Sequence, residues 1–190
     1  ISGLGIASFG PIDIDPTSSR YGQILETPKK GWSGVNLKSG FDNALGVNCV
    51  VNTDVNGALL GEMQWGRAQG VNSAAYVTIG TGIGAGIFLN GGFVGAPTHP
   101  EFGHIRLERH QHDDFEGICS IHRNCLEGLA SAPALSARFG PTKDMDINHK
   151  GWEIESWYLA QACLSLYLTI RPDRIILGGG IMLANGLLDK

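Results

Sequence analysis

The chain has 190 residues, of which 43% are hydrophobic and 17% are charged, so it can bury enough apolar surface to fold, which excludes intrinsic disorder. Its 14 Lys and Arg residues against 18 Asp and Glu residues give a net charge of −4, and without a basic run it lacks the electrostatic footprint of a nucleic-acid-binding protein. No stretch approaches the roughly 18 apolar residues of a membrane span, and the start shows no secretory leader. We therefore expect a cytoplasmic protein whose partners are small molecules rather than nucleic acids or membranes.

The first half of the sequence alternates predicted strands and helices. Residues 1–9 predict a strand, and residues 10–34, which are punctuated by proline and glycine, predict a long ordered loop. A short helix over 37–45, a strand over 48–52 and a helix over 55–68 follow. Asp54 therefore falls where a strand becomes a helix.

The second half begins with strands over 75–79 and 84–89, which a Gly80-Thr81-Gly82 turn would make antiparallel neighbours, before an Asn90-Gly91 hairpin signal. Residues 97–127 show little periodicity. Helices are predicted over 132–139 and 152–170, then a strand over 174–177 that meets three glycines and a further helix, where a helix N-terminus can receive a phosphate. The sequence predicts an α/β fold in two halves joined near residues 66–72.

The strongest local motif is Cys119-x-x-His122-x-x-Cys125. The four cysteines of the chain are expected to be reduced, because a chain of this size does not need disulfides. Thiolates and an imidazole at this spacing can close on one tetrahedral ion, which predicts a structural zinc site. His104, His110 and His112 are all near enough to supply a fourth ligand, and spacing does not choose among them. Two buried cysteines beside a surface histidine are the alternative.

Asp54 lies in the segment Asn52-Thr53-Asp54-Val55-Asn56, at the end of a predicted strand. Open α/β sheets bind ligands at this edge, and a carboxylate there can accept a proton from a substrate hydroxyl. The alternative is that Asp54 caps the following helix.

Glycines recur at alternate positions from Gly80 to Gly86 around Thr81. Such a segment exposes successive N–H groups as a phosphate cradle does, but it joins two strands, so a plain glycine hairpin is the alternative. Glu101, His104 and Glu127 are polar groups that could converge on sugar hydroxyls. Solvated surface acids and a loop histidine are the alternatives here.

Taken in order, these segments resemble the ROK sugar kinases, and most closely the bacterial fructokinases of that family. The resemblance runs through essentially the whole chain and rests on Phe9-Gly10-Pro11-Ile12-Asp13, Asn52-Thr53-Asp54-Val55-Asn56 with Glu62, Ile79-Gly80-Thr81-Gly82-Ile83-Gly84-Ala85-Gly86, His99-Pro100-Glu101-Phe102-Gly103-His104, Cys119 to Glu127, and Gly178-Gly179-Gly180. Two features differ from many members: Thr53 stands where asparagine is common, and the metal loop is not all cysteine. Both differences point to the fructokinase branch.

The resemblance implies an actin-like, hexokinase-like (ribonuclease H-like) ATPase fold, in which two α/β domains flank a cleft that binds the sugar. Residues 1–70 would belong to the N-terminal sugar kinase domain and residues 71–190 to the C-terminal nucleotide- and zinc-binding domain. The family's first phosphate loop and the end of its nucleotide domain have no counterpart in these residues, so this chain alone is expected to be inactive. A homodimer is also implied.

The resemblance further implies ATP-dependent phosphorylation of a hexose, D-fructose to fructose 6-phosphate, with Asp54 as the general base and with ATP, Mg²⁺ and Zn²⁺ as cofactors. By similarity the substrate-binding residues are Asn52, Thr53, Glu101, His104 and Glu127; the nucleotide-binding residues are Gly80, Thr81, Gly82, Pro133, Gly178, Gly179 and Gly180; and the zinc ligands are His104, Cys119, His122 and Cys125. The other readings are a sugar-responsive transcriptional repressor of the same family, a kinase for glucose, mannose or an N-acetylhexosamine, and a zinc-stabilised binding module.

Overall fold

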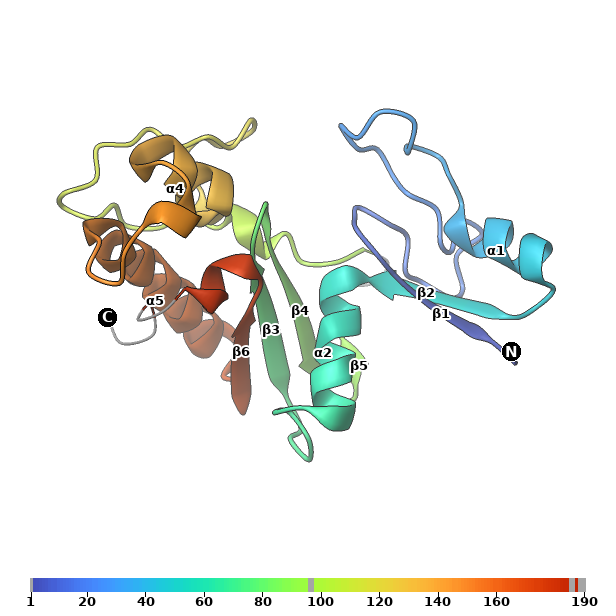
Figure 1. Ribbon diagram of the computed structural model, residues 1–190. Helices are drawn as coiled ribbons and strands as arrows, with labels where there is room; N and C mark the ends of the chain where they lie inside the picture. The colour runs from blue at the N-terminus through green and yellow to red at the C-terminus, as the bar shows by residue number, and fades with distance from the viewer. Residues whose placement is uncertain (1, 96–97, 185–186, 188–190) are drawn as a thin grey trace. The chain divides into compact units, whose positions relative to one another are not determined.

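A computed structural model describes residues 2–95, 98–184 and 187 of the chain (Figure 1). The strands are β1 (Leu4–Ser8), β2 (Cys49–Thr53), β3 (Ala74–Ile79), β4 (Ile83–Leu89), β5 (Gly92–Phe93) and β6 (Arg174–Gly178), and the α-helices are α1 (Leu37–Leu45), α2 (Asp54–Trp65), α3 (Leu126–Ala130), α4 (Ala132–Phe139) and α5 (Lys150–Ile170). Short 3-10 turns cover Phe102–His104, Thr142–Asp144 and Gly180–Leu183. This mixture confirms the predicted α/β class. Among the described residues, no helix is both long and apolar enough to cross a membrane.

The chain forms two compact units. Unit 1 comprises Ile1–Ala74 and Gly86–Pro100, and unit 2 comprises Ala75–Ala85 and Glu101–Lys190. Strands β1 and β2 form a two-stranded parallel sheet, and the remaining strands form a sheet of order β5-β4-β3-β6. The predicted hairpin at Asn90-Gly91 is confirmed, because β4 and β5 are antiparallel and both turn residues have positive φ, 53° and 85°.

In unit 1, the parallel register pairs Leu4 with Cys49 and Ser8 with Thr53. The predicted loop over residues 10–34 is ordered by its own small core, in which Ile12, Ile14 and Ile24 are buried against Val51. Isolated bridges between Ile12 and Ile24 and between Gln23 and Asn36 tie its two limbs together. The loop therefore packs against β2 through its own buried side chains.

Helix α2 packs closely on β1 through a glycine. A Cβ atom at Gly57 would lie 2.7 Å from the Cβ of Ala7, whereas a Cβ at Gly61, one turn later, would meet nothing within 4 Å. Glycine inside a helix ordinarily costs about 0.5–1 kcal/mol relative to alanine. The contact with Ala7 leaves no room for a side chain at position 57, which explains the glycine there.

These two glycines give a matched pair of substitutions. We expect Gly61→Ala to raise the free energy of unfolding by up to about 1 kcal/mol, and Gly57→Ala to lower it by about 1–3 kcal/mol, because the added methyl overpacks the β1 contact. Urea denaturation of both variants checks this. Equal stabilisation by the two substitutions would show that α2 does not approach β1 so closely.

Several elements differ from the prediction, and three of these differences have a local physical reason. Helix α2 ends at Trp65 rather than residue 68, because Gly66 leaves the helical conformation and the Glu62 carboxylate accepts the N–H of Arg67 at 2.8 Å. Helix α3 lies inside the segment that shows little periodicity, since its five residues are too few to produce a periodic signal. The helix expected after the three glycines is instead a 3-10 turn, Gly180–Leu183, with residues 185, 186 and 188–190 outside the described part of the chain.

A buried polar network joins the loop before the cysteine motif to α4 and α5 in unit 2. The Arg138 guanidinium lies 2.6 Å from Oδ2 of Asp113, and both side chains are at most 5% exposed. The Tyr158 hydroxyl donates to the same carboxylate oxygen at 2.6 Å, and burial together with this bond raises the pKa of Tyr158 to about 12. Arg138 also donates to the carbonyl of Leu129 at the end of α3. The network fixes α3, α4 and α5 against one another, consistent with their grouping in Figure 1.

Glu155 on α5 is fully buried beside this network, and neither carboxylate oxygen has a hydrogen-bond partner among the described residues. Burial raises the pKa of Glu155 well above its usual range, although attraction to Arg138 opposes the shift. The folded chain therefore keeps a proton that the unfolded chain releases at a lower pH.

The sign of the resulting pH dependence follows from linkage. Because the folded-state pKa is raised, Glu155 costs stability increasingly as pH rises above the unfolded carboxyl pKa of about 4.3. We expect Glu155→Met to be more stable than the parent chain at pH 8, with the difference shrinking toward pH 5. Thermal denaturation over this range measures it, and exposed Glu153→Met on the same helix is the control. A difference independent of pH would show that Glu155 is ionised in the folded chain.

Candidate functional site

In unit 1, Asp54 occupies the first turn of α2 at the carboxyl end of β2. The helix N-cap is Thr53, whose hydroxyl accepts the N–H of Asn56 at 3.2 Å, so the alternative in which Asp54 is the cap is wrong. The Asp54 side chain is exposed, with Oδ1 accepting the N–H of Val55 at 2.8 Å. This fixes one oxygen of the carboxylate on the helix and leaves the group accessible to a ligand.

The side-chain amides of Asn52 and Asn56 stabilise the junction between β2 and α2 by hydrogen bonds. Oδ1 of Asn52 accepts the backbone N–H of Thr53 at 2.9 Å and Nδ2 of Asn56 at 2.8 Å, so the Asn52 oxygen is engaged and its NH₂ group is the donor it can offer a ligand. Asn56 is fully buried. Gly86 on β4 lies so close that a Cβ there would be 2.5 Å from the carbonyl oxygen of Val55. The glycine that ends the repeated glycine segment thus supports the start of α2.

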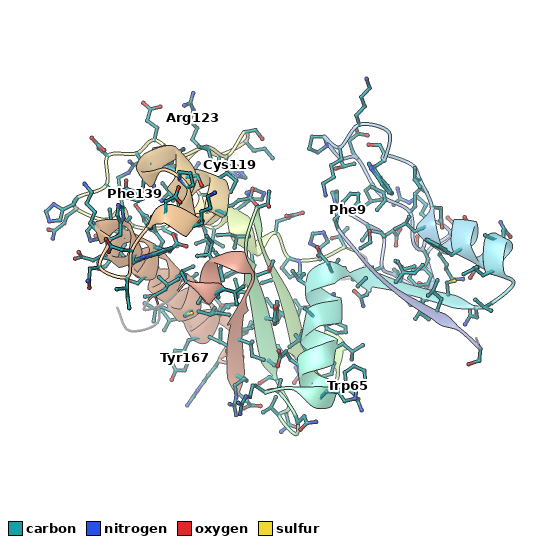
Figure 2. The ribbon with its side chains drawn as sticks, viewed as in Figure 1. Phe9, Trp65, Cys119, Arg123, Phe139 and Tyr167 are labelled. Carbon is teal, nitrogen blue, oxygen red and sulfur yellow. The ribbon has the colours of Figure 1, made fainter. Side chains whose placement is uncertain are left out.

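An aromatic and cationic cluster emerges beside this junction. Because β1 and β2 are parallel and Ser8 pairs with Thr53, Phe9 leaves the sheet at the same edge as Asp54, and Figure 2 shows it at the end of β1. The Phe9 ring meets Trp32 edge-on, with centroids 5.2 Å apart, and the Lys29 ammonium lies 3.4 Å from the Phe9 centroid. The sequence motif around Phe9 did not indicate this cluster, which depends on the return of the loop.

In unit 2, His104, Cys119, His122 and Cys125 form one cluster, and their ligand atoms all lie within 4.8 Å of one another. Nδ1 of His104 is 3.4 Å from Sγ of Cys125 and 3.7 Å from Sγ of Cys119, and Sγ of Cys119 is 4.0 Å from Nδ1 of His122. Zn–S bonds of about 2.3 Å and Zn–N bonds of about 2.05 Å at tetrahedral angles place sulfur and nitrogen ligands about 3.6 Å apart. The donor set therefore fits a tetrahedral zinc ion, with His104 as the fourth member.

The cysteine motif is shaped by a tight turn (Figure 2). Cys119 and Arg123 exchange two backbone hydrogen bonds, of 3.2 and 2.9 Å, and Arg123 adopts a positive φ of 58°. This returns the chain so that Cys125 faces Cys119. Both cysteines are buried, and all four cysteines of the chain are free thiols. Burial raises the pKa of the Cys125 thiol, so a bound cation is what would favour its thiolate form.

His110 and His112, the other candidates for the fourth ligand, belong to a different neighbourhood. Their rings lie 5.6 Å apart, and His110 also packs edge-on against Trp157 of α5. The described residues place neither of them in the metal-ligand cluster.

Three segments, two of them rich in glycine, converge at the end of β3. The Gly80-Thr81-Gly82 turn follows β3 directly, and its Gly80 carbonyl accepts the N–H of Ala132, the residue before Pro133 at the start of α4, at 2.8 Å. A Cβ at Gly179 would overlap the carbonyl oxygen of Ile79, the last residue of β3. Residues 80–82, 133 and 178–180 are thus brought to one place, with exposed Thr81 at the turn.

A cavity of ≈ 470 Å³ lies beyond the last of these glycines in unit 2. It is lined by Leu183, the last residue of the 3-10 turn, by Ala184, which follows it, and by Thr142, Lys143, Met145, Asp146, Ile147 and Trp152. The sequence did not indicate it, because most of its lining residues come from the link between α4 and α5, which has no motif.

The predicted catalytic and substrate-binding residues fall into two groups, one in each unit. Asn52, Thr53 and Asp54 belong to unit 1, and Glu101, His104 and Glu127 belong to unit 2. Within unit 2, Glu101 directly precedes the 3-10 turn that carries His104, and Glu127 lies in the first turn of α3. Oε2 of Glu127 accepts the N–H of Ile83 at 3.0 Å, a contact that no sequence motif predicts.

Comparison with known proteins gives a consistent result. The model of the ROK family matches residues 1–190. The chain is 45% identical over 183 residues to a putative fructokinase of Bacillus subtilis and 45% identical over 184 residues to a fructokinase of Lactococcus lactis, covering 96% of this chain and 61% and 62% of those proteins. A ROK hexokinase structure from Thermus thermophilus superposes with a TM-score of 0.76 at 26% identity, covering 99% of this chain and 66% of that one. The predicted hexokinase-like, actin-like fold is confirmed, and the chain spans about three fifths of the length of these curated relatives.

Proposed function

We propose that this chain, which belongs to the ROK family, is the sugar- and metal-binding part of an ATP-dependent hexose kinase, and that its substrate is D-fructose. The observation that carries the proposal is the accessible Asp54 carboxylate at the sheet edge, fixed on the first turn of α2 by the hydrogen bond to Val55. The similarity to fructokinases over 96% of the chain supports fructose over other hexoses.

In this proposal Asp54 is the general base. Its carboxylate accepts the proton of the sugar hydroxyl as that oxygen attacks the γ-phosphate of ATP, so the proton moves to Asp54 and ADP leaves. The NH₂ group of Asn52 donates a hydrogen bond to the sugar, and Thr53 caps the helix so that Asp54 stays at the sheet edge. A positioned base of this kind contributes about 10²–10⁴-fold to the rate.

Phosphoryl transfer needs positioning and charge neutralisation more than covalent chemistry. We assign the turn of Gly80, Thr81 and Gly82 to the phosphates, because the N–H groups of Thr81 and Gly82 and the Thr81 hydroxyl are donors. Gly178 to Gly180 and Pro133 border the nucleotide, and the ≈ 470 Å³ cavity beyond them has the size of a site for its base. Mg²⁺ bound to the ATP phosphates would supply charge neutralisation.

Glu101, His104 and Glu127 are assigned to the sugar hydroxyls. His104 would serve twice, since Nδ1 faces the cysteine sulfurs of the cluster and leaves Nε2 for a hydroxyl. Zinc held by His104, Cys119, His122 and Cys125 would supply structural cross-linking of the loop.

The remaining assignments follow from the family. We propose that residues 1–70 belong to the sugar kinase domain and residues 71–190 to the nucleotide- and zinc-binding domain. We also propose that the whole protein acts as a cytoplasmic homodimer on sugar and ATP.

A substrate panel tests the proposal. ADP release by the whole protein is measured with ATP and Mg²⁺ against fructose, glucose, mannose and N-acetylhexosamines. Turnover with kcat/KM highest for fructose is expected. A higher value for another sugar would move the assignment to that sugar, and sugar binding without turnover of any of them would favour a sugar-sensing regulator.

A further inference from the structure

Ile83, the residue after the Gly80-Thr81-Gly82 turn, is held by its backbone from two sides. Its N–H donates to Oε2 of Glu127 at 3.0 Å. Its carbonyl packs against the Cα of Gly103 so closely that a Cβ at Gly103 would overlap the carbonyl oxygen. Ile83 is itself 6% exposed, so both contacts are made in the interior of unit 2.

The residues that make these contacts lie beside metal-ligand cluster residues in the sequence. Gly103 immediately precedes His104, and Glu127 is two residues after Cys125. The intervening backbone is short and ordered, since Phe102–His104 is a 3-10 turn and Glu127 lies in the first turn of α3. A displacement of the cluster would therefore move Gly103 and Glu127 with it.

Few contacts within the Gly80-Thr81-Gly82 turn define its shape. Within it, the N–H of Gly80 donates to the carbonyl of Gly82 at 3.0 Å, and two of its three residues are glycine, which permits many backbone conformations. Outside it, the Gly80 carbonyl accepts the N–H of Ala132 at 2.8 Å, and Oε2 of Glu127 lies 2.8 Å from where a Cβ of Gly82 would be. Glu127 is thus the side chain that contacts both the turn and the N–H group that follows it.

We propose that Glu127 is a positioning residue for the phosphate-binding turn: through the N–H of Ile83 it sets the conformation of Gly80-Thr81-Gly82 and makes that conformation depend on the metal-ligand cluster. One carboxylate oxygen makes this bond, so the role is compatible with the other oxygen contacting a sugar. The inference rests on the proposed assignment of the turn to the phosphates of ATP. It extends that assignment by linking nucleotide affinity to the metal cluster.

Two substitutions in the whole, metal-loaded protein test the proposal. Glu127→Ala removes the acceptor, and Glu127→Gln keeps an uncharged one; Glu116→Ala, which removes an exposed carboxylate paired with Arg123, is the control. The readouts are amide hydrogen exchange of Ile83, resolved by NMR, and the Kd for ATP with Mg²⁺ in the absence of sugar.

For Glu127→Ala we expect about tenfold or faster exchange at Ile83 and a Kd for ATP raised about tenfold, with Glu127→Gln between it and the parent and Glu116→Ala unchanged. If Glu127→Ala weakens sugar binding while the Ile83 exchange rate and the ATP Kd stay as in the parent, Glu127 is a sugar ligand only and the proposal is overturned.

Removal of the metal from the unsubstituted protein is a second test, which does not depend on whether a variant folds. A chelator is expected to accelerate exchange at Ile83 at least as much as Glu127→Ala does, while exchange in β1 and β2 of unit 1 stays unchanged. Unchanged exchange at Ile83 after metal loss would overturn the link to the cluster. If the parent protein binds no ATP, the proposed function fails instead, and the exchange rate at Ile83 still decides whether Glu127 positions the turn.

Discussion

Asp54→Asn is expected to lower kcat for fructose about 10³-fold while leaving the KM for fructose within about threefold, because the amide retains the shape of the carboxylate but cannot take the proton of the attacking hydroxyl. The substituted side chain stays on the first turn of α2, which Thr53 caps independently. Initial rates of ADP release and a sugar-binding measurement on the same preparation separate loss of chemistry from loss of binding.

Glu153→Gln is the matched control, since Glu153 is also an exposed acid in the first turn of a helix, α5. This substitution removes a comparable interaction between a carboxylate and a helix dipole, about 0.3–1 kcal/mol, and leaves the carboxyl end of β2 unchanged. Full activity of this variant is expected. If Asp54→Asn retains more than a tenth of the parent kcat, the proton goes elsewhere and Asp54 is not the general base.

Cys125→Ser is expected to have the largest effect on stability. The side chain is fully buried and faces His104, and its loss removes one of four ligands, so we expect bound zinc to fall from one ion per chain to near zero. The free energy of unfolding should fall by about 4 kcal/mol, as is typical for loss of a structural metal. Elemental analysis and thermal denaturation measure the two effects.

Cys163→Ser is the control, because Cys163 is a half-buried cysteine of α5 outside the metal-ligand cluster. Its metal content should match the parent. A chelator should reduce the thermal stability of the parent and of Cys163→Ser, and leave Cys125→Ser unaffected. A parent protein that holds no metal, or a Cys125→Ser variant that holds as much as the parent, would show that the cluster is not a zinc site.

The elements with regular patterns are predictable from the sequence. Helices over 37–45 and 132–139 begin and end as predicted, since polar or glycine residues bound each apolar pattern. The position of Asp54 between strand and helix is confirmed for the same reason. The identity of the helix cap is not predictable from the sequence. Thr53 and Asp54 are both good capping residues, and only the backbone conformation decides between them.

The metal-ligand cluster is only partly predictable. The spacing of Cys119, His122 and Cys125 indicates three ligands, because one turn brings them together. The fourth ligand comes from a separate segment, so spacing leaves three histidines open, and family resemblance selects His104. The structure places His104 in the cluster because the 3-10 turn from Phe102 docks Gly103 on Ile83.

Contacts between distant segments are beyond the reach of sequence patterns. Glu127 and Ile83 are separated by 44 residues, and Asp113 and Arg138 by 25. One partner of each pair, Glu127 or Asp113, lies in the segment without periodicity, so no face could be inferred for it. Such contacts depend on the path of irregular loops, which is set by many weak interactions rather than by a local motif.

The product decides most directly whether this chain belongs to a sugar kinase. The whole protein is incubated with fructose, ATP and Mg²⁺, and the phosphorus-containing products are identified by ³¹P NMR. We expect fructose 6-phosphate and ADP in equal amounts, both absent when Asp54→Asn replaces the parent over the same time. Release of inorganic phosphate without a sugar phosphate, or no consumption of ATP with any hexose, would contradict the proposed function.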